Sequence, residues 1–261
     1  MNSQPTVPAP AASLLLLRPA AAGFEVFMVG RPPTGTFSSA LVFPGGKVSE
    51  GDSAPDLLAC CDGVVELEAR DAAHRVGAVR EAFEEAGILL ARRGGHWLAS
   101  ARAEAFAEER RAVAADTLAF DRFLAAEGLR LALDALVPFA HWITPAAMRR
   151  RFDTRFFVAL APTGQEGMHA GGELVSSGWF APMDALKMGA SGSAKLMFPT
   201  RMNLLRLLES PTAEAALDAA RRQRIVPIEP VITERDGKLY STIPAAAGYP
   251  GTEHLLDGPD A

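Results

Sequence analysis

The chain has 261 residues, of which 49% are hydrophobic and 22% are charged, a balance typical of a globular protein rather than a disordered or fibrous one. Its formal net charge of −5 argues against a general binder of nucleic acid or of anionic membranes. The two cysteines, Cys60 and Cys61, are adjacent and so are poorly placed to form a disulfide with each other, which favours a reducing, cytoplasmic setting.

The N-terminal part of the chain predicts a tail followed by a β-hairpin. Residues 1–10 are rich in Pro and Ala, and we expect them to be disordered. Residues 13–18 contain a run of leucines and residues 24–30 are rich in bulky apolar side chains, which predicts two strands joined by a turn. Arg31 follows the second strand. It is a candidate phosphate ligand, and the alternative is that it only caps the end of the strand.

The next motif is the segment FPGG at residues 43–46, which follows a predicted strand at 40–43. Pro-Gly-Gly favours a sharp turn, and a glycine without a Cβ atom lets the backbone approach a ligand closely. Gly45 and Gly46 are therefore candidate substrate-binding residues.

The segment REAFEEAGI at residues 80–88 places three carboxylates on one face of a predicted helix at 72–86, because Glu81, Glu84 and Glu85 are spaced i, i+3 and i+4. Gly87 is the predicted left-handed stop. The three charges repel one another near the negative end of the helix dipole. A hard divalent cation would compensate for this repulsion. The alternative is a solvated acidic face.

Taken together, these two motifs resemble the signature of the Nudix hydrolases. Gly46 supplies the first glycine, Asp52 stands where the family usually has glutamate, and residues 80–88 supply the Arg-Glu and Glu-Glu pairs, with Ala82 at the aliphatic place. Residues 53–79 form a spacer much longer than the common one. A subgroup that includes peroxisomal coenzyme A diphosphatases has the same FPGG turn, nearby Asp and long insert, so the chain resembles that subgroup in particular.

After the signature, the sequence predicts a strand, then a helical stretch, then further strands of the sheet. Residues 88–91 predict a strand, 92–95 a turn, and 101–130 two helices, the second at 120–127. We expect these helices to cap the active site, and the alternatives are packing alone or a dimer contact. Residues 135–144 and the second half of the segment 149–160 predict strands.

The segment RFDTRFF at residues 151–157 also resembles the subgroup. Arg155 is a candidate for bidentate phosphate binding, and the alternative is a salt bridge with Asp153. Glu173 begins a predicted strand that runs to residue 180, and the resemblance makes it a candidate member of the catalytic cluster. The rival interpretation is a solvent-facing glutamate. Helices are predicted at 182–188, 199–209 and 210–223, and late strands at 225–232 and 238–243.

The order of elements predicts the α/β class, and the resemblance implies a Nudix α/β/α sandwich with a mixed β-sheet and a helical insertion. We expect residues 11–261 to form a single Nudix domain with insertions at about 53–71 and 98–130.

The function that the resemblance implies is metal-dependent hydrolysis of the pyrophosphate bond in a nucleoside diphosphate linked to another moiety, with Mg²⁺ or Mn²⁺ as cofactor. Glu81, Glu84 and Glu85 would bind the metal, and one of them, or Glu173, would be the general base. Arg80 would orient a glutamate, and Asp52 is a weaker candidate behind the metal ligands.

The substrate is left open. The subgroup suggests coenzyme A or acyl-CoA. Coenzyme A hydrolases of another Nudix branch carry an Arg-Ser-containing motif before FPGG. Residues 30–33 do not reproduce this motif, so an ADP-sugar or a dinucleotide is an alternative substrate. A catalytically silent nucleotide sensor is the alternative of another class. The expected partner is a small molecule, with neither nucleic acid nor membrane, and a homodimer is possible.

Overall fold

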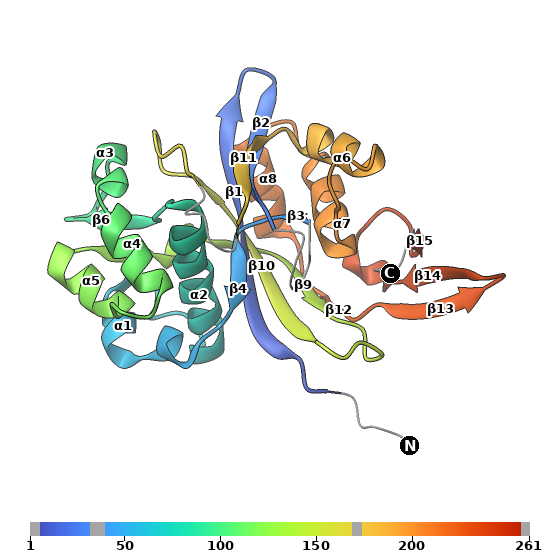
Figure 1. Cartoon of the computed structure of the whole chain (residues 1–261), viewed down its shortest axis with the longest axis horizontal. Helices are drawn as coiled ribbons and strands as arrows, with labels where there is room; N and C mark the ends of the chain where they lie inside the picture. The colour runs from blue at the N-terminus through green and yellow to red at the C-terminus, as the bar shows by residue number, and fades with distance from the viewer. Residues whose placement is uncertain (1–5, 32–39, 169–173, 257–261) are drawn as a thin grey trace.

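The computed structural model describes residues 6–31, 40–168 and 174–256. Its centre is a mixed sheet in the order β11-β2-β1-β10-β9-β12, with β3 added to β2 and β4 added to β1 (Figure 1). β1 and β10 are parallel, whereas β1 and β2 are antiparallel. The strands are β1 (Ala9–Ala20), β2 (Gly23–Gly30), β3 (Leu41–Val42), β4 (Gly45–Lys47), β9 (Val137–Ile143), β10 (Phe152–Leu160), β11 (Ser176–Phe180) and β12 (Pro227–Ile228).

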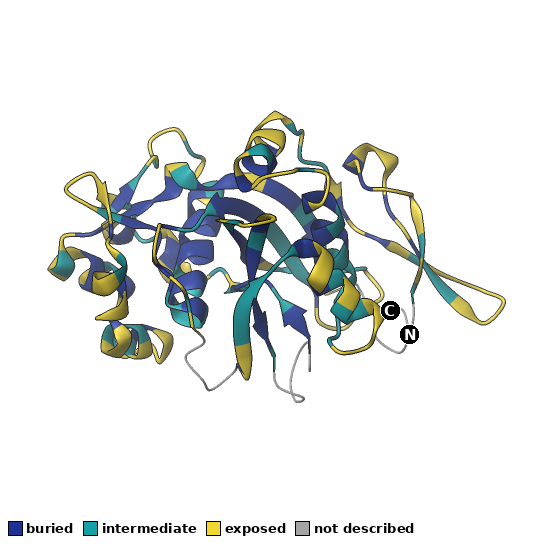
Figure 2. Cartoon of the chain, turned by 90° about the horizontal axis from the view of Figure 1, so that it is seen from above, coloured by how far each residue is buried: buried dark blue, intermediate teal, exposed yellow. Residues whose placement is uncertain are grey.

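The sheet is covered by helices on both faces, which confirms the α/β/α sandwich. Successive side chains of a strand point to opposite faces, so Leu14 and Leu16 pack with α2 (Ala69–Ala86), whereas Leu15 and Leu17 pack with the helices of the other layer. That other layer is formed by α6 (Pro182–Ala190), α7 (Phe198–Leu207) and α8 (Ala213–Arg222). Figure 2 shows the strands as the buried centre between the two layers.

Helix α2 carries the acidic motif and is the most buried helix of its layer. It begins at Ala69, three residues before the predicted start, and ends as predicted, because Gly87 adopts a left-handed conformation (φ 70°) and its N–H bonds to the Phe83 carbonyl at 2.9 Å. Val79 and Phe83 are fully buried against the sheet, and this anchors the helix and sets the direction of its acidic face.

The helical insertion lies beside α2, on the same side of the central sheet (Figure 1). Its helices are α1 (Pro55–Ala59), α3 (Ser100–Glu104), α4 (Ala107–Ala114) and α5 (Phe120–Glu127), with 3₁₀ turns η1 (Glu50–Ser53) and η2 (Leu133–Ala135). A small sheet in the order β5-β8-β6-β7 joins them, formed by β5 (Cys61–Asp62), β6 (Ala91–Arg93), β7 (His96–Trp97) and β8 (Arg130–Ala132). The helix predicted at 120–127 is confirmed, and the stretch before it forms two helices rather than one.

Two local predictions in this region are wrong. The strand expected at 88–91 begins only at Ala91, and residues 92–93, expected in a turn, lie in β6. The reason is that the backbone of Leu89 is hydrogen-bonded to a side chain rather than to a neighbouring strand. The Gln165 Oε1 accepts from the Leu89 N–H at 2.9 Å, and the Gln165 Nε2 donates to the Leu89 carbonyl at 3.3 Å. The two buried backbone groups are satisfied without a ladder.

The chain termini also differ from the prediction. β1 begins at Ala9, which pairs with Phe152, so the expected tail at 1–10 ends at least two residues earlier. At the other end, Pro227–Ile228 pairs with β9 rather than with the later strands. A separate three-stranded sheet is formed by β13 (Val231–Arg235), β14 (Lys238–Thr242) and β15 (Glu253–Leu256). The 3₁₀ turn η3 (Ala245–Ala247) lies between β14 and β15 in the chain. The β13–β14 hairpin projects from the body (Figure 1).

Among the described residues, no helix has both the length and the apolar character that a membrane span requires. The division into one domain with two insertions stays a prediction.

The FPGG turn gives a direct test of close backbone packing. A Cβ atom on Gly45 would lie 2.5 Å from the Ala12 carbonyl oxygen and 2.8 Å from the Ser13 Cα atom. We expect Gly45→Ala to lower the free energy of unfolding by about 3 kcal/mol in urea titrations, because backbone cannot yield as a side chain can. Gly51→Ala is the control, since its nearest neighbour is the Ser49 hydroxyl at 3.7 Å, and it should change stability by less than about 0.5 kcal/mol. Equal effects of the two substitutions would contradict this account.

Candidate active site

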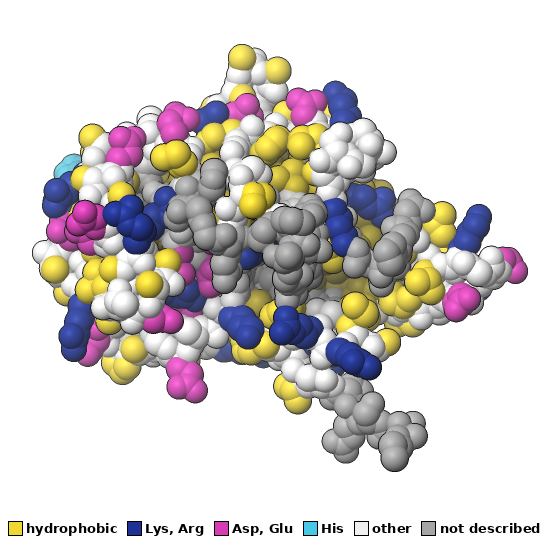
Figure 3. Space-filling view, viewed as in Figure 1, with side chains coloured by type: hydrophobic (Ala, Val, Ile, Leu, Met, Phe, Trp, Pro, Cys, Tyr) yellow, Lys and Arg dark blue, Asp and Glu magenta, His cyan; other side chains and the backbone are white. Residues whose placement is uncertain are grey.

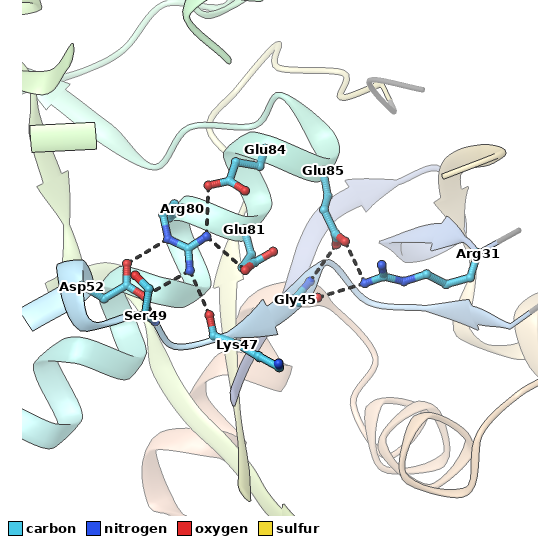
Figure 4. A network of polar contacts seen from close by, with 9 residues as sticks. All are labelled: Arg31, Gly45, Lys47, Ser49, Asp52, Arg80, Glu81, Glu84 and Glu85. Atoms are coloured by element: carbon cyan, nitrogen blue, oxygen red, sulfur yellow. Dashed lines mark hydrogen bonds and ion pairs between the residues drawn. The ribbon is translucent and has the colours of Figure 1, made fainter. Parts of the chain in front are cut away.

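The centre of the site is the guanidinium of Arg80, on α2, which donates to four different residues (Figure 4). Its Nε and Nη2 bind the two carboxylate oxygens of Asp52 at 2.8 and 3.1 Å, and its Nη1 lies 3.0 Å from an oxygen of Glu81 and 3.0 Å from one of Glu84. Nη2 also donates to the Lys47 carbonyl at 2.9 Å. Arg80 therefore joins the acidic face of α2 to β4 and to η1.

Asp52 is the deepest group of this network. Only 1% of it is exposed, and its second oxygen also accepts the Ser49 N–H at 2.8 Å, which closes η1. Burial opposes the positive charge of Arg80, but the hydrogen bonds and the charge of Asp52, with those of Glu81 and Glu84, outweigh it and raise the pKa of Arg80 above its ordinary value. Asp52 thus acts on the site through Arg80.

Glu85 turns to the other side of the helix end and meets the FPGG turn. One of its oxygens accepts the Gly45 N–H at 2.9 Å, and the other lies 2.7 Å from Nη2 of Arg31. The same Arg31 nitrogen donates to the Gly45 carbonyl at 3.1 Å. Arg31 thus lies beside the acidic cluster and contacts a carboxylate, and its role in phosphate binding stays a prediction.

Glu81 packs directly against the glycine turn. A Cβ atom on Gly46 would lie 2.4 Å from a Glu81 carboxylate oxygen, so a larger residue here would force this carboxylate to move. Burial raises the pKa of Glu81 to about 7, against the lowering effect of Arg80 and with the help of the neighbouring Glu85 and Glu84 charges. Burial likewise raises the pKa of Glu84, opposed by Arg80.

The donor set suits a hard divalent cation, because it consists of carboxylate oxygens crowded into one helical turn. As the side chains lie, however, no three acidic, His or Cys side chains of the described residues are arranged to hold a metal ion together. Arg80 draws Glu81 and Glu84 to one side, and Gly45 and Arg31 draw Glu85 to the other. The joint metal-ligand role of the three glutamates stays a prediction.

One predicted site residue, Arg155, is not part of this cluster. Arg155, on β10, lies 2.9 Å from a carboxylate oxygen of Asp71 in the first turn of α2, whereas the acidic cluster is in the last turns. The expected alternative partner, Asp153, instead contacts Arg70 at 2.5 Å and also His141. Glu173 lies outside the described residues.

One nearby residue was not singled out from the sequence. Arg110, on insertion helix α4, donates its Nε to the Glu84 carbonyl at 3.0 Å. In the sequence it is one of two adjacent arginines in a charge-rich helix, and nothing there distinguishes it from its neighbour.

A cavity of about 150 Å³ lies among α7 and α8 and is lined by residues including Phe139, Arg206 and Gln223. It is in the layer opposite to α2, away from Glu81, Glu84 and Glu85.

Comparison with known proteins places this geometry in context. Residues 65–207 match the family model described as the NUDT19 Nudix domain. The crystal structure of a NUDIX hydrolase from Alicyclobacillus acidocaldarius is similar, with a TM-score of 0.72 and 30% sequence identity, over 82% of this chain and 96% of that one. "Putative nudix hydrolase 7" from Caenorhabditis elegans is 27% identical over 184 residues, which is 70% of this chain and 55% of that protein. The chain therefore spans about half the length of this curated relative.

The raised pKa of Glu81 predicts a pH dependence of stability without divalent cations. Because folded Glu81 keeps its proton up to about pH 7 and the unfolded side chain loses it near 4.5, the folded state binds more protons between these values. The free energy of unfolding should therefore fall as pH rises through this window, by up to about 3 kcal/mol from this group. Urea titrations of wild type and Glu81→Gln in chelator at several pH values measure this fall in the free energy of unfolding. The variant should lack the part that comes from Glu81. Identical pH slopes would rule it out.

The Arg80 network predicts a large loss of stability when its cation is removed. In Arg80→Met, the nearly buried Asp52 keeps the Ser49 N–H but no guanidinium, and we expect a loss of about 3–5 kcal/mol. Adding Asp52→Asn should recover part of this loss, because the uncompensated charge disappears. As a control, Arg221→Met removes the exposed ion pair with Asp218 and should change stability by less than about 1 kcal/mol. No recovery in the double variant would argue against a buried charge pair.

Proposed function

Because this chain belongs to the Nudix hydrolase superfamily, we propose that it is a pyrophosphohydrolase that acts on a nucleoside diphosphate linked to another moiety. The observation that carries the proposal is the gathering of Glu81, Glu84 and Glu85 around the FPGG turn, with Arg80 and Arg31 holding them. Fold alone would not identify a reaction, since one fold hosts many activities. The acidic cluster is the part of the molecule that suits this chemistry.

Glu81, Glu84 and Glu85 are the residues that would hold Mg²⁺ or Mn²⁺. The bound cation would neutralise the diphosphate and lower the pKa of a water molecule. Support for this assignment comes from the pKa of Glu81, raised by burial and by its acidic neighbours, because such crowding is relieved by a cation. The side chains would have to turn partly from their arginine partners to meet at one ion.

Residues of the chain would also accept the water proton and orient the glutamates. Hydrolysis forms a bond between the water oxygen and one phosphorus atom, breaks the bridging P–O bond, and passes the water proton to a base. Glu81, Glu84, Glu85 and Glu173 are the candidates for this base. Arg80 orients Glu81 and Glu84, and the Gly45 N–H orients Glu85.

Coenzyme A or acyl-CoA is the substrate class that we favour, since the matching family model is that of the NUDT19 Nudix domain and the sequence resembles peroxisomal coenzyme A diphosphatases. An ADP-sugar or a dinucleotide is the alternative. The surface supports an anionic small molecule: on the face drawn in Figure 3, Lys and Arg side chains gather along the lower front, near the place where Figure 1 has β4 and the lower ends of β9 and β10. This local basic character contrasts with the net charge of −5.

We expect Glu84→Gln or Glu85→Gln to lower Mg²⁺-dependent kcat/KM by about 10²-fold or more while the circular dichroism spectrum stays unchanged, because several kcal/mol of charge stabilisation depend on the cation. The substrates to compare are coenzyme A, ADP-ribose and NADH, each with and without Mg²⁺. Full turnover in excess chelator would overturn the metal mechanism. Tight binding without turnover of any of them would favour a nucleotide sensor.

A further inference from the structure

Arg110, on insertion helix α4, contacts the backbone at the end of α2. Its Nε donates to the Glu84 carbonyl at 3.0 Å, in the last turn of the helix. Carbonyls in this turn have no partner within the helix and form the negative end of its dipole. Arg110 therefore binds the backbone from which the acidic side chains of Glu84 and Glu85 extend.

The helix end is shaped to receive this guanidinium. A Cβ atom on Gly87 would lie 2.7 Å from Nη1 of Arg110 and 3.3 Å from its Cζ. The glycine that stops α2 in the left-handed conformation thus also leaves the space that Arg110 fills. A larger residue at this position would displace the guanidinium from the Glu84 carbonyl.

The charge of Arg110 has no carboxylate partner among the described residues. Its Nη2 is buried without a hydrogen-bond acceptor, whereas Arg80 and Arg31 both contact carboxylates. Burial lowers the pKa of Arg110 to about 10, opposed only by the nearby charge of Glu85, so the group stays positive at neutral pH. A half-buried cation without a carboxylate partner in the described part of the chain, close to the acidic cluster, acts on any charge that enters that cluster.

The charges around the end of α2 show how the positive charge of Arg110 affects cation binding. Asp52, Glu81, Glu84 and Glu85 supply four carboxylates, and Arg80 and Arg31 supply two positive charges in direct contact with them. Arg110 adds a third. We propose that Arg110 weakens the binding of a divalent cation to the substrate-free carboxylates, so that the helical insertion sets the metal affinity of the site. This inference rests on the proposed metal role of Glu81, Glu84 and Glu85.

The test measures Mn²⁺ binding to the full chain without substrate, by electron paramagnetic resonance of free Mn²⁺. Arg110→Gln should lower the Kd for Mn²⁺ on the order of tenfold, because one repelling charge is removed from a partly desolvated position. Arg110→Lys keeps the charge and should stay within about twofold of wild type. Arg111→Gln is the matched control, since it makes the same charge change at an exposed position of the same helix, and it too should stay within about twofold.

An unchanged or higher Kd in a folded Arg110→Gln protein would overturn the inference, as would an equal shift in Arg111→Gln. If Arg110→Gln does not fold, Arg110→Met keeps the alkyl stem and carries the same expectation and the same refutation. Failure of the proposed function looks different: wild type would bind no Mn²⁺, or would bind it as tightly after Glu84→Gln and Glu85→Gln.

Discussion

The hydrogen bonds of the Arg80 guanidinium are the interaction on which the site depends. Without a cation at this place, Asp52, Glu81 and Glu84 would be acids brought together in a largely buried space, at the end of a helix dipole that disfavours them. Arg80 satisfies all three and also ties them to the β4 backbone. Because guanidinium donors have a fixed planar arrangement, the positions of these carboxylates are linked to one another.

Close approach of backbone is the second requirement, and glycines provide it from two elements. Gly46 leaves room for the Glu81 carboxylate, and Gly77, inside α2, faces Asp52, where a Cβ atom would lie 3.0 Å from a carboxylate oxygen. A glycine inside a helix costs about 0.5–1 kcal/mol relative to alanine. Here that cost allows the helix, the turn and the buried acid to lie in contact, and this contact is what brings α2 to the FPGG turn.

The helical insertion changes what such a site can do. In chain order it surrounds α2, with α1 before the helix and α3 to α5 after it, and in space it packs on the same layer. The stacked rings of Phe83 and Phe123 join the two, at 5.4 Å between centroids. The insertion is thereby held firmly enough to place a charged side chain at the helix end, and this is the basis for assigning it an electrostatic effect on the site.

Helical spacing and a glycine stop are properties of short segments, so the sequence by itself predicted the acidic face of α2 and its end at Gly87. The resemblance of two short motifs to the Nudix signature predicted the family and the sandwich architecture. The sequence also offered Arg31 and the FPGG turn as candidate substrate-binding elements, but it did not pair Arg31 with a carboxylate. Only the tertiary structure decided which arginine meets which acid: Arg31 with Glu85, Arg155 with Asp71 far along the helix, and Arg110 with the Glu84 carbonyl. Such pairings depend on distances between segments remote in the chain, and neither spacing nor composition contains those distances.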